Sequence, residues 1–375
     1  MTRRAEIVGA GFAGLTAACA LAQRGWRVRV HERADRLRPT GSGIYVYENG
    51  LRVLEALGAY DDAVRGAPFA HTREVRDDKN NVISVHRWGG SRVFSIVRQT
   101  IINALGAAAQ RAGAEIVFNS QGVAATPDGE LQLSDGSRVK ADLIVAADGT
   151  HSKVRDSLHL ISTHKYLVDG CTRFLMPKTP EEHGVDGATT IEYWSGSRRV
   201  LYTPCSETEI YIALTMLDSD GDAKAVPVRK DLWKHWFPHV APLIDRFGVE
   251  ARYDRFEFLK LKRWSSGKVA VIGDAANALP PNIGQGGGCA MMNGLSLAVY
   301  LDRERDIQRA LAEWERAERP LTEHTQRWTR IYGTTMFLPK PLKKVSILFE
   351  RIPWVAAQYL RVANHVPTGC QEAAA

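Results

Sequence analysis

The most constraining feature of this 375-residue chain is a glycine-rich turn near its start. Glu6 to Gly9 has the pattern of a short buried strand, and Gly14 to Arg24 has the alanines and leucines of a helix that packs on a sheet. Gly9, Gly11 and Gly14 between them have the Gly-x-Gly-x-x-Gly spacing. That spacing permits a tight turn, a close backbone approach to a pyrophosphate, and close packing of helix on strand. It predicts a βαβ unit that binds a dinucleotide at a helix N-terminus.

An acidic residue at the end of the next strand supports this interpretation. Trp26 to His31 alternates as a second strand and is followed by Glu32, 18 residues after Gly14. A carboxylate there accepts hydrogen bonds from a ribose diol and disfavours a 2′-phosphate. The adenosine is therefore expected to be that of FAD or NAD. A glycine turn without a ligand is the alternative, and the acid disfavours it.

Two later segments place acidic turns at strand ends. The apolar run Asp142 to Ala147 stops at Asp148-Gly149, with Arg155 close behind, and the strand-like run Val269 to Gly273 stops at Asp274. In open α/β sheets, ligands bind at the carboxyl ends of the strands. Asp274 is suited to the hydroxyls of a ribityl chain.

A proline- and glycine-rich stretch follows Asp274. Pro280-Pro281 and Gly284 to Gly288 lead into a helical pattern, whose N-terminus is expected to face the pyrimidine edge of a flavin and to stabilise negative charge there. Taken in order, the three segments suit three different parts of FAD.

Composition narrows the class of ligand. The net charge is +7, yet the arginines are spread along the chain and no basic stripe with interleaved aromatics is present, which argues against nucleic acid. The positive field favours anionic small molecules. The five cysteines form no Cys-x-x-Cys pair, so neither a metal centre nor a disulfide framework is expected, and a reducing compartment fits.

The chain is expected to be cytoplasmic, without membrane insertion, because it contains no apolar run of about 18 residues. The segment 341–360 mixes basic and apolar residues and would suit a membrane-surface helix. A C-terminal helix that packs on its own domain or on a partner subunit is the favoured interpretation.

The predicted fold class is α/β. It comprises a Rossmann-like FAD-binding domain of the glutathione-reductase type, an interleaved antiparallel β-sheet substrate domain, and a C-terminal helical segment. Thr72 to Trp88 reads as a β-hairpin, and Tyr166 to Leu217 alternates with period two, so both are assigned to the antiparallel sheet. The predicted divisions are 1–71, 98–164 and 265–330 for the FAD-binding domain, 72–97 and 165–264 for the substrate domain, and 331–375 for the C-terminal segment.

With these motifs the chain resembles the single-component flavoprotein aromatic-ring hydroxylases, those similar to p-hydroxybenzoate hydroxylase, over residues 3 to 330. Arg98 matches the family's flavin-contacting arginine, whereas Asn277 stands where many members carry histidine. The cofactor-binding positions expected are Gly9, Gly11, Phe12, Ala13, Gly14, Glu32, Arg33, Gly43, Arg98, Asp148, Gly149, Arg155, Gly273, Asp274, Pro281, Gly284, Gly286 and Gly287.

Within the family, the chain is most similar to the oxygenases that open hydroxypyridine-carboxylate rings. The likeness implies that Arg199, Tyr211, Tyr45 and Arg173 contact the substrate. An arginine can clamp a carboxylate and a tyrosine can hold a ring oxygen. Arg198, next to Arg199, is expected to point to the opposite face. The hairpin near Thr72 to Glu74 lacks an expected pocket tyrosine, and Phe256 stands in place of another.

The resemblance implies a monooxygenase that binds FAD tightly but non-covalently and takes NADH or NADPH as a transient reductant. Dioxygen would give a flavin C4a-hydroperoxide that oxygenates a small anionic 3-hydroxypyridine carboxylate such as 5-hydroxynicotinate, with ring opening. A phenol or salicylate hydroxylase that keeps the ring is one alternative. A non-catalytic flavin-binding sensor or interaction protein is another, and a homo-oligomer is compatible with each.

Overall fold

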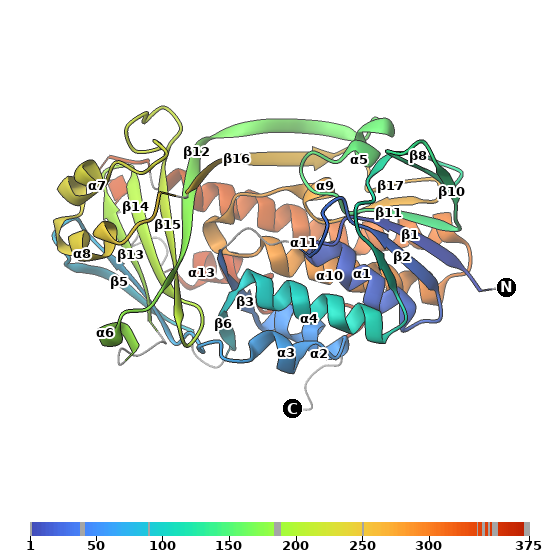
Figure 1. Ribbon diagram of the computed structural model, residues 1–375, viewed down its shortest axis with the longest axis horizontal. Coiled ribbons are helices and arrows are strands. Elements are labelled where there is room, and N and C mark those ends of the chain that lie inside the picture. Colours follow the sequence, from blue (N-terminus) through green and yellow to red (C-terminus); the bar gives the residue numbers. More distant parts are fainter. Residues whose placement is uncertain are drawn as a thin grey trace.

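The computed structural model describes residues 2–370 apart from 38–41, 89–90, 184–188, 250, 336, 340–341, 344–345 and 347–351. The chain forms an elongated molecule with a mainly parallel sheet and its helices at one end and a seven-stranded sheet at the other (Figure 1). The seven-stranded sheet is antiparallel, as predicted, except where the strands at Thr189–Ser195 and Thr72–Arg76 pair in parallel. This is the predicted α/β class.

The six-stranded sheet brings the three motif-bearing strands together. Its spatial order is β17 (Ser265–Ser266), β18 (Val269–Val271), β11 (Leu143–Ala146), β1 (Arg4–Val8), β2 (Arg27–His31) and β7 (Glu115–Val117). All neighbours except β17 pair in parallel. Because β18, β11 and β1 are adjacent and parallel, their carboxyl ends lie at one edge. The glycine turn, Asp148 and Asp274 therefore meet there.

Helices cover this sheet. They include α1 (Phe12–Ala22), α4 (Arg98–Arg111) and α10 (Gly286–Arg303), and α1 packs against both of the others. Every residue of α1 from Phe12 to Leu21 is buried, because its small side chains allow close approach. A three-stranded sheet of β8 (Gly122–Thr126), β9 (Glu130–Leu133) and β10 (Arg138–Lys140) lies beside α5 (Lys153–Ser157).

The seven-stranded sheet unites the two predicted β-rich stretches. Its order is β16 (Arg252–Leu261), β12 (Ile161–Pro177), β15 (Glu209–Leu217), β14 (Arg198–Pro204), β13 (Thr189–Ser195), β4 (Thr72–Arg76) and β5 (Val82–Arg87). The long strands β12 and β16 pair along the top of the molecule and join its two ends (Figure 1).

One face of the seven-stranded sheet is covered by its own helices. These are α7 (Lys230–Trp236) and α8 (Ala241–Asp245), joined by η1 (Pro238–Val240). Trp233 of α7, and Phe237 directly after it, belong to one buried cluster with Phe174 and Ile212 of the sheet. This cluster fixes which side chains of each strand remain for the opposite face, since alternate residues point in opposite directions. α6 (Pro180–His183) follows β12.

A two-stranded sheet of β3 (Gly43–Tyr47) and β6 (Val93–Val97) lies next to α2 (Glu48–Ala56) and α3 (Tyr60–Val64). Thus β6, which the predicted boundaries place in the substrate domain, pairs with a strand placed in the FAD-binding domain. The domain boundaries remain our proposal.

The C-terminal part begins with a long helix. α11 (Ile307–Thr335) continues through Pro320, although a proline inside a helix commonly bends or ends it. Pro320 lies on the exposed side of α11, while Leu311 and Trp314 anchor the helix in the core. α13 (Pro353–Leu360) packs on α11. Residues 341, 344–345 and 347–351 of the helix considered at 341–360 lie outside the described residues. In the described part of the chain, no helix is long and apolar enough to cross a membrane.

Candidate active site

The glycine turn has the geometry that a phosphate-binding turn requires. Gly9 has φ of 100°, a conformation that favours glycine, and a Cβ there would lie 2.5 Å from the Ala147 carbonyl oxygen. A Cβ at Gly14 would overlap the Gly9 carbonyl oxygen. At Gly11, by contrast, nothing lies within 4 Å of the Cβ position. Contacts within the protein therefore require glycine at positions 9 and 14, whereas Gly11 borders open space.

Glu32 follows β2 and holds this turn. One carboxylate oxygen accepts a 2.9 Å hydrogen bond from the Ala10 amide, and the other accepts a 2.9 Å bond from the Ala34 amide. Each oxygen keeps lone pairs for further donors. The side chain is therefore oriented beside the turn, where a ribose diol can bind. Arg33, the next residue, is exposed.

The third motif lies against the first. A Cβ at Gly273 would be 2.8 Å from the Ala13 side chain. Asp274 opens α9 (Asp274–Asn277), and its side chain is solvent-accessible, although desolvation by the surrounding protein raises the pKa of its carboxyl and Arg98 lowers it in part. The Arg98 guanidinium also lies 4.9 Å from the centre of the Phe12 ring.

The residues present fit FAD. Gly149 and Gly286, like Gly11, have nothing within 4 Å of their Cβ positions, so the three motifs face open space along one edge. The N-terminus of α10 at Gly286 has no side-chain cap, and its amides are available to an acceptor. Gly287 contacts Ile44 and Phe12, which seats that helix end beside β3.

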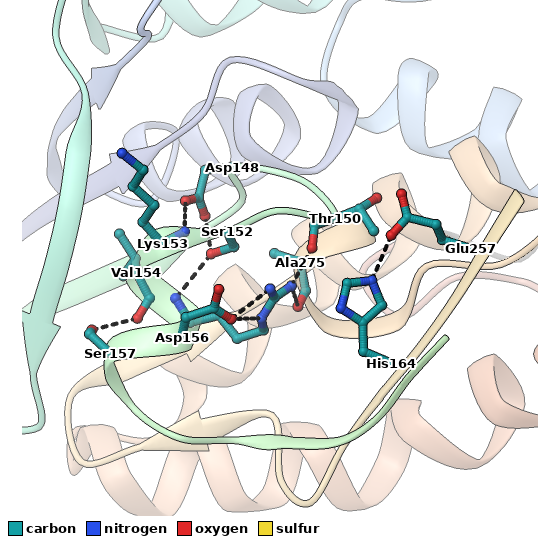
Figure 2. A network of polar contacts seen from close by, with 11 residues as sticks. Asp148, Thr150, Ser152, Lys153, Val154, Asp156, Ser157, His164, Glu257 and Ala275 are labelled. Carbon is teal, nitrogen blue, oxygen red and sulfur yellow. Dashed lines mark hydrogen bonds and ion pairs between the residues drawn. The ribbon is translucent and has the colours of Figure 1, made fainter. Parts of the chain in front are cut away.

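The Asp148 turn is held by an internal network, which Figure 2 shows. The Ser152 hydroxyl donates to Oδ1 of Asp148 and the Lys153 amide donates to Oδ2 at 3.1 Å. Buried Arg155 donates to the carbonyls of Thr150 at 2.8 Å and Ala275 at 3.2 Å. Arg155, expected to bind the cofactor, therefore ties the second motif to the third.

The candidate substrate face is the face of the seven-stranded sheet that α7 and α8 do not cover. The strand register arranges the side chains of this face in three rows across the sheet: Leu175–Tyr211–Thr203, then Arg173–Ala213–Leu201–Glu192–Val75, then Cys171–Thr215–Arg199–Trp194.

β3 packs on the first of these rows. The Tyr45 hydroxyl lies 2.6 Å from Thr203 Oγ1 and 3.2 Å from Thr190 Oγ1, and Gly43 contacts Tyr211. Burial raises the pKa of Tyr45 to about 12, so its hydroxyl stays protonated.

Arg173 and Tyr211 form a second polar group on this face. Arg173 lies on the same face as Tyr211 and forms a 3.0 Å ion pair with Asp254. Tyr211 also packs with Phe256 in a buried cluster. Phe256 stands where the resemblance predicts a tyrosine, so this part of the face is apolar. Gly284, with φ of 66°, lies beside Tyr45, which is 3.4 Å from the Cβ position of this glycine. Pro281 opens the short 3₁₀ turn η2 (Pro281–Ile283) just before it.

Arg199 is buried and already paired. Its NH1 lies 3.2 Å from Glu192 Oε2, its NH2 donates to Thr215 Oγ1 at 3.2 Å, and its Nε has no hydrogen-bond partner among the described residues. As expected, Arg198 points the other way, where it stacks 3.6 Å from the Trp236 ring centre.

Sequence reasoning missed the acid in this pair, Glu192. The signal was available in part: Glu192 is the one charged residue of the stretch Thr189–Ser195, and period-two alternation gives it the face opposite Tyr193. Which arginines it meets depends on the register with β14 and β4.

Asp169 adds a second acid near Arg199 and supports a pH prediction. Its side chain is 3% exposed and Oδ2 has no partner in the described chain. Desolvation, partly offset by Arg199, raises the pKa of Asp169 from 3.8 to about 6. The folded protein therefore holds this proton more tightly than the unfolded chain does. The free energy of unfolding accordingly falls as the pH rises from about 4 to about 6 and stays lower above that range.

Asp169→Asn is therefore expected to stabilise the protein at pH 8 by about 2–3 kcal/mol, with the gain disappearing below about pH 4. Urea unfolding at several pH values measures this difference. Asp302→Asn, at an exposed position, is the control and should be neutral throughout. A gain that is equal at pH 4 and pH 8 would contradict the assignment.

Comparison with known proteins agrees with this geometry. The FAD-binding-domain family matches residues 2–304. The 2-heptyl-3-hydroxy-4(1H)-quinolone synthase of Mycobacteroides abscessus is 42% identical over 86% of this chain and 88% of its own. AqdB1 of Rhodococcus erythropolis, provisionally named as the same synthase, is 44% identical over 86% of this chain and 85% of its own. A structure of 2-methyl-3-hydroxypyridine-5-carboxylic acid oxygenase, in a tetrameric form, has a TM-score of 0.90 and 38% identity over 99% and 98%.

The chain belongs to the FAD-binding-domain family of aromatic-ring hydroxylases. It is an FAD-dependent monooxygenase of aromatic compounds, with NAD(P)H as its reductant, as the sequence predicted. The non-catalytic alternative is thereby set aside.

Proposed function

We propose that this enzyme hydroxylates an uncharged N-heteroaromatic ring of the 2-alkyl-4(1H)-quinolone class and leaves the ring intact. The observation that carries the proposal is the charge pairing on the substrate face. Arg199 and Arg73 both pair with Glu192, and Arg173 pairs with Asp254, so each of these arginines already has a carboxylate partner within the protein. A site of this kind favours a neutral ring over a carboxylate.

The rest of the face suits such a ring. Ala213, Leu201 and Phe256 offer apolar contact, while the hydroxyls of Tyr45 and Tyr211 can bind a ring carbonyl or N–H. The names of the relatives from Mycobacteroides abscessus and Rhodococcus erythropolis point to the same class of product.

FAD, when bound, supplies the reduction of dioxygen and the delivery of one oxygen atom. The balance is substrate, O₂, NAD(P)H and a proton giving hydroxylated product, water and NAD(P)⁺. Asp274, Arg98 and the N-terminus of α10 would hold the cofactor. The sheet face would orient the ring and exclude water from it.

A second candidate is the oxygenation, with ring opening, of a hydroxypyridine carboxylate such as 5-hydroxynicotinate. The buried Nε of Arg199, which lacks a partner among the described residues, favours it, because a guanidinium donor aimed at the site can bind an anion. The 38%-identical oxygenase acts, by its name, on a substrate of this kind. Assembly into a homo-oligomer is likewise proposed from that neighbour's tetrameric form.

The test uses purified FAD-bound enzyme and measures oxidation of NADH and of NADPH with three compounds: 2-heptyl-4(1H)-quinolone, 5-hydroxynicotinate and salicylate. We expect the quinolone to give the highest kcat/KM and a product heavier by one oxygen atom. A product that has gained the elements of water as well identifies ring opening. Faster coupled turnover of 5-hydroxynicotinate than of the quinolone would overturn the first proposal in favour of the second.

A further inference from the structure

Glu192 occupies an unusual position for a carboxylate. It lies on β13, 5% exposed, between β14 and β4 on the candidate substrate face. Its Oε1 accepts hydrogen bonds at 2.8 Å from Arg73, and its Oε2 accepts from Arg199 NH1 and from Trp194 Nε1, both at 3.2 Å. Two guanidinium groups on flanking strands therefore share one carboxylate.

Arg199 and Arg73 are each engaged by this carboxylate and by a neighbouring hydroxyl. Arg199 reaches Glu192 across the strand pair and Thr215 on its other side, so two of its three nitrogens are engaged within the protein. Arg73 is engaged by Glu192 and by the hydroxyl of Tyr332 on α11. The pKa of Glu192 falls to about 2 because both arginines stabilise its charge against the effect of burial, so the charge persists at neutral pH.

We propose that Glu192 is the specificity-determining residue of this enzyme: it acts as a built-in carboxylate that occupies Arg199 and so excludes acidic substrates in favour of neutral rings. This inference deepens the proposed function and depends on it for the identity of the neutral substrate. A purely structural ion pair would make no such distinction between ligands. Loss of such a pair would weaken the binding of neutral and acidic rings alike.

Glu192→Gln tests the proposal, because it keeps the size of the side chain and an oxygen acceptor while removing the charge. Binding is measured on the FAD-bound protein by the change in flavin absorbance, without turnover, for 5-hydroxynicotinate and for 2-heptyl-4(1H)-quinolone. We expect 5-hydroxynicotinate to bind at least about tenfold more tightly than to the unmodified enzyme, as one restored charge-assisted contact allows. The affinity for the quinolone should change by less than about threefold.

Glu74→Gln is the matched control. Glu74 lies on the adjacent strand β4, is partly buried and pairs with Arg76, but it points to the opposite face of the sheet. It should leave both affinities unchanged. If Glu192→Gln alone does not fold, the double variant Glu192→Gln with Arg73→Gln removes one complete charge pair and leaves Arg199, and the same gain for 5-hydroxynicotinate is expected.

Equal changes in both affinities, or no gain for 5-hydroxynicotinate in either variant, would overturn the proposal. Failure of the proposed function is a separate result. It would show as absence of quinolone hydroxylation in the unmodified enzyme, whereas the ratio of the two binding constants still reports on Glu192.

Discussion

Gly11→Val is expected to yield a folded protein that does not retain FAD. Apart from the chain neighbours of Gly11, no atom of the described residues lies within 4 Å of its Cβ position. The Gly11 backbone φ of −88° is one that valine adopts, so the fold accommodates the side chain. The side chain would instead fill the space from which the turn approaches a pyrophosphate. Losing two backbone hydrogen bonds to a charged phosphate weakens FAD binding by about 3–6 kcal/mol, roughly 100-fold or more.

The measurement is the flavin content of the purified protein together with FAD titration of the apoprotein. Gly221→Val is the control, because Gly221 also has nothing within 4 Å and lies in a loop after β15. Gly14→Ala offers a contrast: its Cβ would overlap the Gly9 carbonyl oxygen, so the protein itself should be destabilised. Yellow, FAD-saturated Gly11→Val protein would refute the placement of the pyrophosphate.

Arg155→Met is expected to destabilise the protein by roughly 3 kcal/mol and to loosen FAD binding as well. The Arg155 side chain is 1% exposed, and its NH1 satisfies the carbonyls of Thr150 and Ala275, from two different motifs. Methionine fills similar space but leaves both carbonyls without this donor. The Asp148 turn and the segment after Asp274 would then no longer be held together.

Urea unfolding and FAD titration measure the two effects. Arg138→Met is the matched control, since Arg138 is 64% exposed and makes only a surface ion pair with Glu130, which contributes about 0–1 kcal/mol. If Arg155→Met lowers FAD affinity at unchanged stability, the arginine contacts the cofactor directly, as the sequence led us to expect.

Much of the FAD-binding half could be predicted from the sequence because its signals are local. A Gly-x-Gly-x-x-Gly turn between a strand and a helix has few structural alternatives, and Glu32, Asp148 and Asp274 each follow a recognisable strand. The adjacency of β1, β11 and β18 then follows from parallel pairing. The role of Arg155 could not be predicted in this way, since one of its two carbonyl acceptors, Ala275, lies 120 residues further along the chain.

The arrangement of side chains in the substrate half can be predicted only in part from the sequence. Alternation along β14 assigns Arg199 and Arg198 to opposite faces, and the structure confirms this. Nothing in the order of residues shows that Arg199 meets an acid, because Glu192 reaches it only through the register of β13 with β14.

By itself, then, the sequence determined the cofactor, the α/β class and the family, because each depends on short motifs whose geometry is set by neighbouring residues. The tertiary structure decided the electrostatic character of the substrate face. Charge pairing between strands depends on long-range register, and register is fixed by packing of the whole sheet rather than by any one segment. The same arginine that the sequence presents as an anion clamp is, in the fold, already paired with Glu192.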